Sequence, residues 1–325
     1  MKSRKILFSL IALMLITLCG MYSGFFFTAK DYNVGAEQEK DQDITDLEPD
    51  EDEDEEPDHD GNDDGGDSDI QIPTDSLELI NYGLNIYQNG AGSQANYSYS
   101  LFAKAAAYGQ KADSTQYIKG RMTYSGGKSL DEAFWSYEHN ATNAIIAGYG
   151  RLKEECRVMY TEKEKDYVAV GSTKNMNLTN LTYQFDETNW RAEYNYKDAT
   201  EAYKVFWADG FPYQINKNTV KVTRHDSRSS KYYTKITVSC DVNKLPDTFR
   251  DYYFRNNGMI RVNYTNYEFT FIISKKTGKI KKIIRSEDFW CRVIDAGYDV
   301  TIYCKTNCTQ DFVVMDKAIN VIKPF

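Results

Sequence analysis

Hydrophobic residues beyond position 75 follow two different periods. Over 76–88 they recur every three or four positions, as on one face of a helix, and Asp75 before them is a favourable N-cap residue. Two further segments, 198–208 and 245–256, also favour short helices. From position 97 onward the apolar residues mostly alternate with polar ones, as in strands with one buried face.

The alternating segments are numerous and are separated by turn-forming residues. Strands are predicted at 97–107, 115–124, 133–137, 143–149, 156–161, 167–171, 219–223, 236–242, 267–274, 279–285, 289–294 and 300–303. Many antiparallel strands with a few short helices indicate an α+β domain. We expect its sheet to be strongly bent and half-barrel-like.

Small side chains gather on one face of the first two strands. The residues that would line this face are Leu101, Ala103, Ala105, Ala107, Ile118, Gly120 and Met122. They allow two interpretations. The small side chains could leave an apolar cavity for a lipid-like ligand, or they could let a helix pack closely on the sheet.

A hairpin near the end of the chain suggests a disulfide. If its turn covers 296–299 with Gly297 at the first central position, Cys291 faces Cys304 at a close-approach position of the ladder. A cross-strand disulfide Cys291–Cys304 would then fit the geometry, and two small buried thiols are the alternative.

The order of these elements resembles the LolA-like half-barrel, the fold of periplasmic lipoprotein carriers and their relatives on bacterial surfaces. The resemblance covers about 76–315 and concerns architecture. It rests on a leading helix, the strand segments Ala103-x-Ala105 and Ile118-Lys119-Gly120, and a late hairpin over 269–285 that turns at Lys276-Thr277-Gly278-Lys279 and continues into Glu287-Asp288-Phe289. It implies a bent sheet that could carry an apolar ligand.

An uncharged run of twenty-two residues, 6–27, precedes all of this. As a helix it would rise about 33 Å, enough to cross a hydrocarbon core of roughly 30 Å. Lys2, Arg4 and Lys5 before it place the N-terminus in the cytoplasm and the rest outside, in a single-pass topology. The alternatives are a cleaved signal peptide and lipidation at Cys19.

Charge divides the remaining chain into two parts. Residues 31–75 contain twenty-one acidic residues and one lysine, whereas 76–325 carry a net charge of +7. Like charges without apolar residues predict a disordered linker. The expected organisation is a membrane anchor at 1–30, an acidic linker at 31–75 and an extracytoplasmic domain at 76–325.

Motifs for catalysis, cofactors and metals are absent. There is no G-x-S-x-G or H-E-x-x-H, and a calcium-loop-like start at Asp60 has Gln71 where a glutamate should stand. We therefore expect no enzyme, no cofactor and no metal site. A net charge of +7 outside the cytoplasm also speaks against nucleic acid.

The predicted function is a membrane-anchored extracytoplasmic binding module for a lipid-like ligand or an envelope component. The alternative is a surface protein-interaction domain with a filled core. Basic residues around the hairpin 269–285 could attract lipid headgroups or an anionic envelope polymer, or could merely protect a sheet edge.

Overall fold

The structure is a computed structural model. It describes residues 71–107, 110–141, 153–162, 165–172, 176–177, 182–185, 190–194, 220–226, 231–244, 260–295 and 298–325. The predicted anchor, the linker up to residue 70, the strand at 143–149 and the helices at 198–208 and 245–256 lie outside these residues. None of the helices within the described ranges has the length and apolar character needed to cross a membrane.

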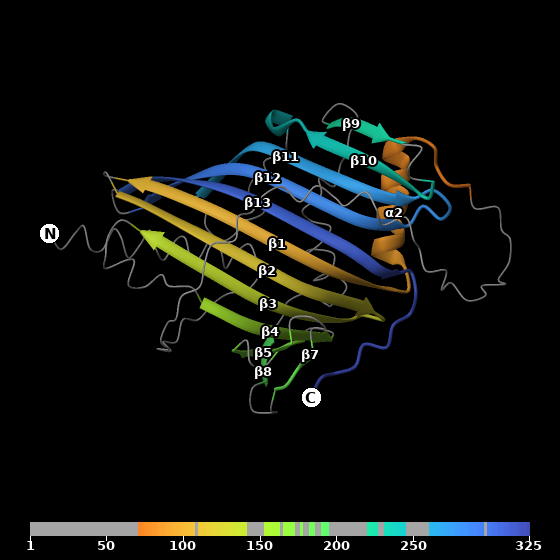
Figure 1. The fold of residues 1–325 in the computed structure, drawn as a ribbon, viewed down its shortest axis with the longest axis horizontal. Coiled ribbons are helices and arrows are strands. Elements are labelled where there is room, and N and C mark those ends of the chain that lie inside the picture. The colour runs from red at the N-terminus through yellow and green to blue at the C-terminus, as the bar shows by residue number, and fades with distance from the viewer. Residues whose placement is uncertain are drawn as a thin grey trace.

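In the described part of the chain, eleven strands form one antiparallel sheet, which is not closed into a barrel (Figure 1). Its strands are β1 (Gly92–Ala107), β2 (Gln110–Ser125), β3 (Lys128–Ala141), β4 (Lys153–Glu162), β5 (Lys165–Gly171), β8 (Trp190–Tyr194), β9 (Val220–His225), β10 (Tyr233–Cys240), β11 (Ile260–Ser274), β12 (Ile280–Asp295) and β13 (Tyr298–Met315). A separate pair, β6 (Met176–Asn177) and β7 (Thr182–Tyr183), and the 3-10 helix η3 (Val242–Lys244) complete the strands and turns.

The spatial order of the large sheet is β8-β5-β4-β3-β2-β1-β13-β12-β11-β10-β9. The strands from β1 to β8 and those from β9 to β13 therefore follow sequence order within this sheet, and the two series join at the centre. There β1, the first strand, pairs with β13, the last, in antiparallel register from Ser93↔Met315 to Ala106↔Thr301. Two meanders thus meet along a single central ladder.

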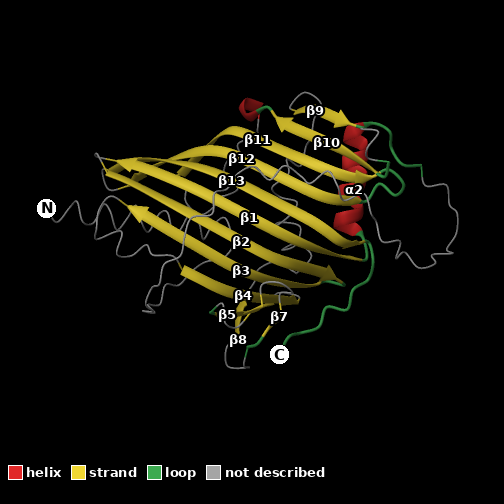
Figure 2. Ribbon diagram, in the orientation of Figure 1, coloured by secondary structure: helices red, strands yellow, loops and turns green. Residues whose placement is uncertain are grey.

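The predicted first helix is confirmed as α2 (Ser76–Asn89), which lies across one end of the strands (Figure 2). The Asp75 carboxylate accepts hydrogen bonds from the backbone N–H groups of Leu77 (3.0 Å) and Glu78 (3.2 Å), as an N-cap should. The helix packs on one face of the sheet through Ile80 and through Tyr87, whose ring meets that of Phe312 edge-on at 5.0 Å. We call this the inner face and its opposite the outer face.

The alternating pattern of β1 is confirmed residue by residue. Tyr97, Leu101 and Ala105 are nearly or fully buried on the inner face, whereas Phe102 on the outer face is 46% exposed. Successive residues of a strand point to opposite faces, so this burial pattern sets the register of the central strands. The turn between β2 and β3 is formed by Gly126 and Gly127, which both have positive φ, as a two-residue type I′ turn requires.

A second, smaller hydrophobic cluster lies on the outer face of β3 and β4. Phe134, Cys156 and Val158 are buried there beneath Phe185 and Trp190, whose rings are 6.1 Å apart. This side of the sheet therefore carries apolar contacts on its outer face as well.

Two predictions about the last strands are wrong. The segments 279–285 and 289–294, expected as two strands, form one strand, β12, in which Glu287 between them is buried on the inner face. The hairpin register is also shifted by two residues, so that Cys304 faces Phe289 and Cys291 faces Ile302.

The predicted Cys291–Cys304 disulfide is consequently not formed, and Cys304 is buried and outside any disulfide. The shift makes the two cysteines diagonal neighbours, whose Cα atoms are about 7–8 Å apart in a sheet. That separation exceeds the roughly 4.4–6.8 Å that a disulfide spans.

Candidate functional site

The predicted ligand-lining residues all map to β1 and β2. Their positions in the register place them together on the inner face. The members with described side chains are buried: Leu101, Ala103, Ala105, Ile118, Gly120 and Met122. The side chain of Ala107 is not among those that the structure describes.

One of these positions is filled by a neighbouring side chain. The ring of Tyr97 lies so close to Gly120 that a β-carbon there would be 2.5 Å from Cζ of the ring. The missing side chain of Gly120 therefore makes room for a tyrosine from β1 to cross β2.

The Tyr97 hydroxyl ends at Asp131 on β3. It donates a hydrogen bond of 2.6 Å to Asp131 Oδ1, and both side chains are buried. Burial raises the pKa of Asp131 to about 7, although the hydrogen bond from Tyr97 and the charge of Arg157 oppose this. Burial, together with the Asp131 carboxylate, also raises the pKa of Tyr97 well above its usual value.

Next to this pair, Arg157 on β4 is held by two groups. Its Nη2 lies 3.2 Å from Glu155 Oε1, and its guanidinium stands over the Trp135 ring, 4.7 Å from the centroid. Both charged side chains are 7% exposed, so this pair is almost withdrawn from water. Removing either partner would leave the charge of the other buried without a counter-ion, which strongly destabilises a folded protein.

A second polar group lies on the other side of β1. Glu287 on β12 is fully buried and accepts a hydrogen bond of 2.7 Å from the Thr306 hydroxyl on β13. Arg285 contributes a weaker contact, with Nε 3.9 Å from Glu287 Oε1. Sequence reasoning missed both polar groups, although continuing the period-two pattern of β12 through Glu287 would have placed that residue inside.

Two buried glutamine amides have an atom left without a partner. Among the described residues, Gln116 Oε1 on β2 and Gln310 Nε2 on β13 lack any hydrogen-bond partner, and the two residues are only 2% and 3% exposed. Gln116 lies opposite Leu101, and Gln310 lies opposite Tyr97. An unpaired buried polar atom costs about 1–3 kcal/mol, which makes these amides candidates for contact with a ligand.

The basic residues predicted around the β11–β12 hairpin are largely paired. Lys282 Nζ lies 3.1 Å from Asp311 Oδ2, and Lys279 Nζ lies 3.9 Å from Asp316 Oδ2. The positive charge is thus partly compensated by β13 and the residue after it, which weakens the attraction for an anionic polymer.

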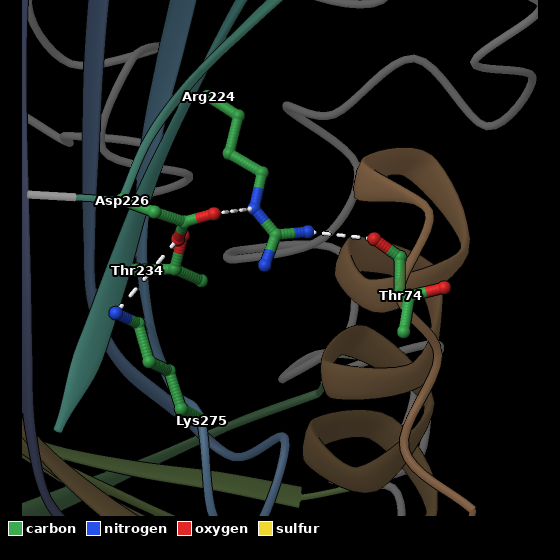
Figure 3. A network of polar contacts seen from close by, with 5 residues as sticks. All are labelled: Thr74, Arg224, Asp226, Thr234 and Lys275. Carbon is green, nitrogen blue, oxygen red and sulfur yellow. Dashed lines mark hydrogen bonds and ion pairs between the residues drawn. The ribbon is translucent and has the colours of Figure 1, made fainter.

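Lys275 belongs to a further network that joins α2 to the sheet edge (Figure 3). Asp226, just after β9, receives hydrogen bonds from Arg224 Nε (2.6 Å) and the Thr234 hydroxyl, and Lys275 Nζ lies 4.0 Å away. Arg224 Nη1 also donates to the backbone carbonyl of Thr74, at 2.7 Å. These contacts lower the pKa of Asp226, the hydrogen bond from Thr234 contributing most.

Over the part of the chain that the structure describes, no three histidine, cysteine or acidic side chains gather in a way that could hold a metal ion. The buried carboxylates named above instead contact tyrosine, threonine or arginine. Their geometry is that of a polar network within a core.

Comparisons with known proteins leave the family open. No family model matches the chain, and neither does any curated protein. Among solved structures, the chain is similar to a beta-barrel-like protein of the domain of unknown function DUF1849 from Brucella abortus, with 8% identity over 68% of this chain and 97% of that one, at a TM-score of 0.20.

Proposed function

We propose that the chain is a membrane-anchored extracytoplasmic binding module that takes an amphipathic, lipid-like ligand on the inner face of its sheet. The observation that carries the proposal is the pair of unpartnered amides, Gln116 and Gln310, beside the apolar side chains of β1 and β2. A ligand with an apolar body and a polar group would place its body against these side chains and its polar group within hydrogen-bonding reach of an amide.

The energetics favour such a ligand. The ligand's own apolar surface would leave water when it packs against Leu101, Ile118 and Met122, which contributes roughly 25 cal/mol per Å². A hydrogen bond to Gln116 Oε1 removes the cost of leaving that atom unpaired. The order of elements also resembles the half-barrel architecture of LolA-like carriers, and this resemblance supports an apolar ligand on the inner face.

The test is to extract the purified full-length chain with organic solvent and identify bound molecules by mass spectrometry. Because the predicted anchor would retain bulk lipid in any preparation, the comparison is between variants. Gln116→Leu and Ala103→Leu should each lose one specific molecule that the wild type retains. Lys119→Ala, on the outer face, is the matched control and should retain it. Identical extracts from all four proteins would overturn the proposal.

A second candidate is a surface interaction domain with a filled core. The packing of Tyr97 over Gly120 favours it, because at least this part of the inner face is occupied by the protein's own side chain. Affinity capture from intact cells should then return one specific partner, equally with the wild type and with Gln116→Leu. Loss of the partner in the Gln116 variant would instead support binding at the inner face.

A further inference from the structure

Exposed aromatic side chains form a row on the outer face at the centre of the sheet. Tyr117 is 42% exposed, Phe102 46% and Tyr303 59%, and Trp290 is partly exposed. They lie on β2, β1, β13 and β12, four strands that are consecutive in the sheet. We call these four residues the aromatic row.

The register shows that the row is continuous. Tyr303 lies directly opposite Trp290. Phe102 lies between Tyr117 and Tyr303 on the same face. Tyr117 is opposite Ser100 and Tyr303 is opposite Lys104, each two residues from Phe102 along β1. The row therefore runs diagonally across the strands. At about 4.8 Å between strands, the row extends roughly 14 Å across the sheet.

The positions around the row carry small polar side chains. Hydroxyl and amide groups surround it on the same strands: Ser98, Ser100, Thr115, Asn307 and Thr309. Most described basic residues of this face have a carboxylate beside them: Lys104 lies opposite Asp113 and Lys305 opposite Asp288, Arg121 is paired with Glu132, and Lys282 is paired with Asp311. This face is therefore aromatic, rich in hydrogen-bonding groups and close to neutral.

We propose that the outer face binds a linear polysaccharide made of uncharged sugar rings. The apolar faces of such rings stack on exposed aromatic side chains, and their hydroxyl groups hydrogen-bond to serine, threonine and asparagine. A polymer fits better than a single sugar because the aromatic side chains follow one another across four strands.

The same features argue against a protein, a membrane or a nucleic acid as the partner of this face. Serine is depleted in protein–protein interfaces, whose centres are apolar and exclude water, whereas Ser98 and Ser100 lie beside this row. Anionic membrane surfaces and nucleic acids select clusters of positive charge, whereas most basic residues described on this face have a carboxylate beside them. This inference concerns the outer face and does not depend on the ligand proposed for the inner face.

The experiment is native gel electrophoresis of the full-length chain through gels that contain hydroxyethyl cellulose, glucomannan, dextran or no polymer, in a detergent without a sugar headgroup. We expect retardation by at least one of these neutral polymers. Phe102→Ser and Tyr303→Ser should each weaken the apparent affinity about tenfold, as the loss of a central aromatic contact does. Both side chains are exposed, so the variants should keep the thermal unfolding midpoint of the wild type.

Tyr232→Ser is the matched control, because Tyr232 is 48% exposed but lies before β10, outside the row. Its affinity should equal that of the wild type, and so should that of Gln116→Leu. The proposal is overturned if no polymer retards the wild type, or if Tyr232→Ser weakens binding as much as the row variants. It is also overturned if the row variants instead lose self-association or binding to phosphatidylglycerol vesicles.

Discussion

The phenol ring of Tyr97 occupies the space in which a side chain at Gly120 would lie, with a β-carbon there only 2.5 Å from the ring. Because the ring is 5% exposed and its hydroxyl is bonded to Asp131, it cannot move aside without breaking that hydrogen bond. Gly120 and the pair Tyr97–Asp131 thus form one packing unit that spans β1, β2 and β3.

Gly120→Ala should therefore destabilise the protein by about 1–3 kcal/mol, the usual cost of overpacking a core. Urea unfolding monitored by circular dichroism gives the difference. In a Tyr97→Leu background the same substitution should cost much less, because the ring is gone. Equal costs in the two backgrounds would show that the ring is not what limits space at Gly120.

The raised pKa of Asp131 predicts how stability depends on pH. The folded protein holds the proton between pH 3.8 and about 7, where the unfolded chain has released it, so stability is lost as pH rises through this window. The loss amounts to about 4 kcal/mol at most. Urea unfolding at a series of pH values measures it.

Asp131→Asn should remove most of this slope, because an amide does not titrate and its oxygen can still accept the hydrogen bond from Tyr97. A smaller slope should remain from Glu132, whose pKa is also raised by burial. A variant as pH-dependent as the wild type would mean that Asp131 is ionised in the folded state.

The contact between Arg224 and the Thr74 carbonyl predicts a local effect at the start of α2. Arg224→Met should speed hydrogen exchange of the first-turn amides about fivefold to tenfold, since a net hydrogen bond contributes about 1 kcal/mol. Lys244→Met, which removes the exposed pair with Asp241, is the control and should leave these amides unchanged. Unaltered exchange in both variants would show that α2 is held by its apolar face alone.

The register of the last hairpin predicts the state of its thiols. Cys304 and Cys308 are buried and form no disulfide, and burial raises the pKa of Cys308. Both should resist a thiol reagent at pH 8 in the native protein and react fully on unfolding without reductant. A peptide linking residues 291 and 304 in a non-reducing digest would contradict the observed register.

Sequence patterns predicted the secondary structure better than the pairing. Period-two alternation is local, and it identified the buried face of β1. The register of a hairpin depends on which residues form its turn, and a turn placed one residue too late moved Cys291 opposite the wrong partner. The two strands expected at 279–285 and 289–294 are one strand for a different reason. Thr306 hydrogen-bonds to the buried Glu287 carboxylate between them, from a strand that the sequence pattern alone could not pair with it.

The candidate site shows the same limit. The small residues on β1 and β2 were recognisable because they repeat along one strand face. The polar partners come from strands far apart in the sequence, as with Tyr97 and Asp131, and single-sequence periodicity contains no information on such pairs.

The central pairing of β1 with β13 also has a consequence for how the chain folds. The meander from β1 to β8 and the meander from β9 to β13 can each form from neighbouring strands, but the ladder that joins them connects residues such as Ser93 and Met315. Closing so long a loop is entropically slow, and until β13 has been synthesised β1 has an unpaired edge. We therefore expect the nascent chain to depend on protection of that edge, and assembly of the complete sheet to be the last and slowest step of folding.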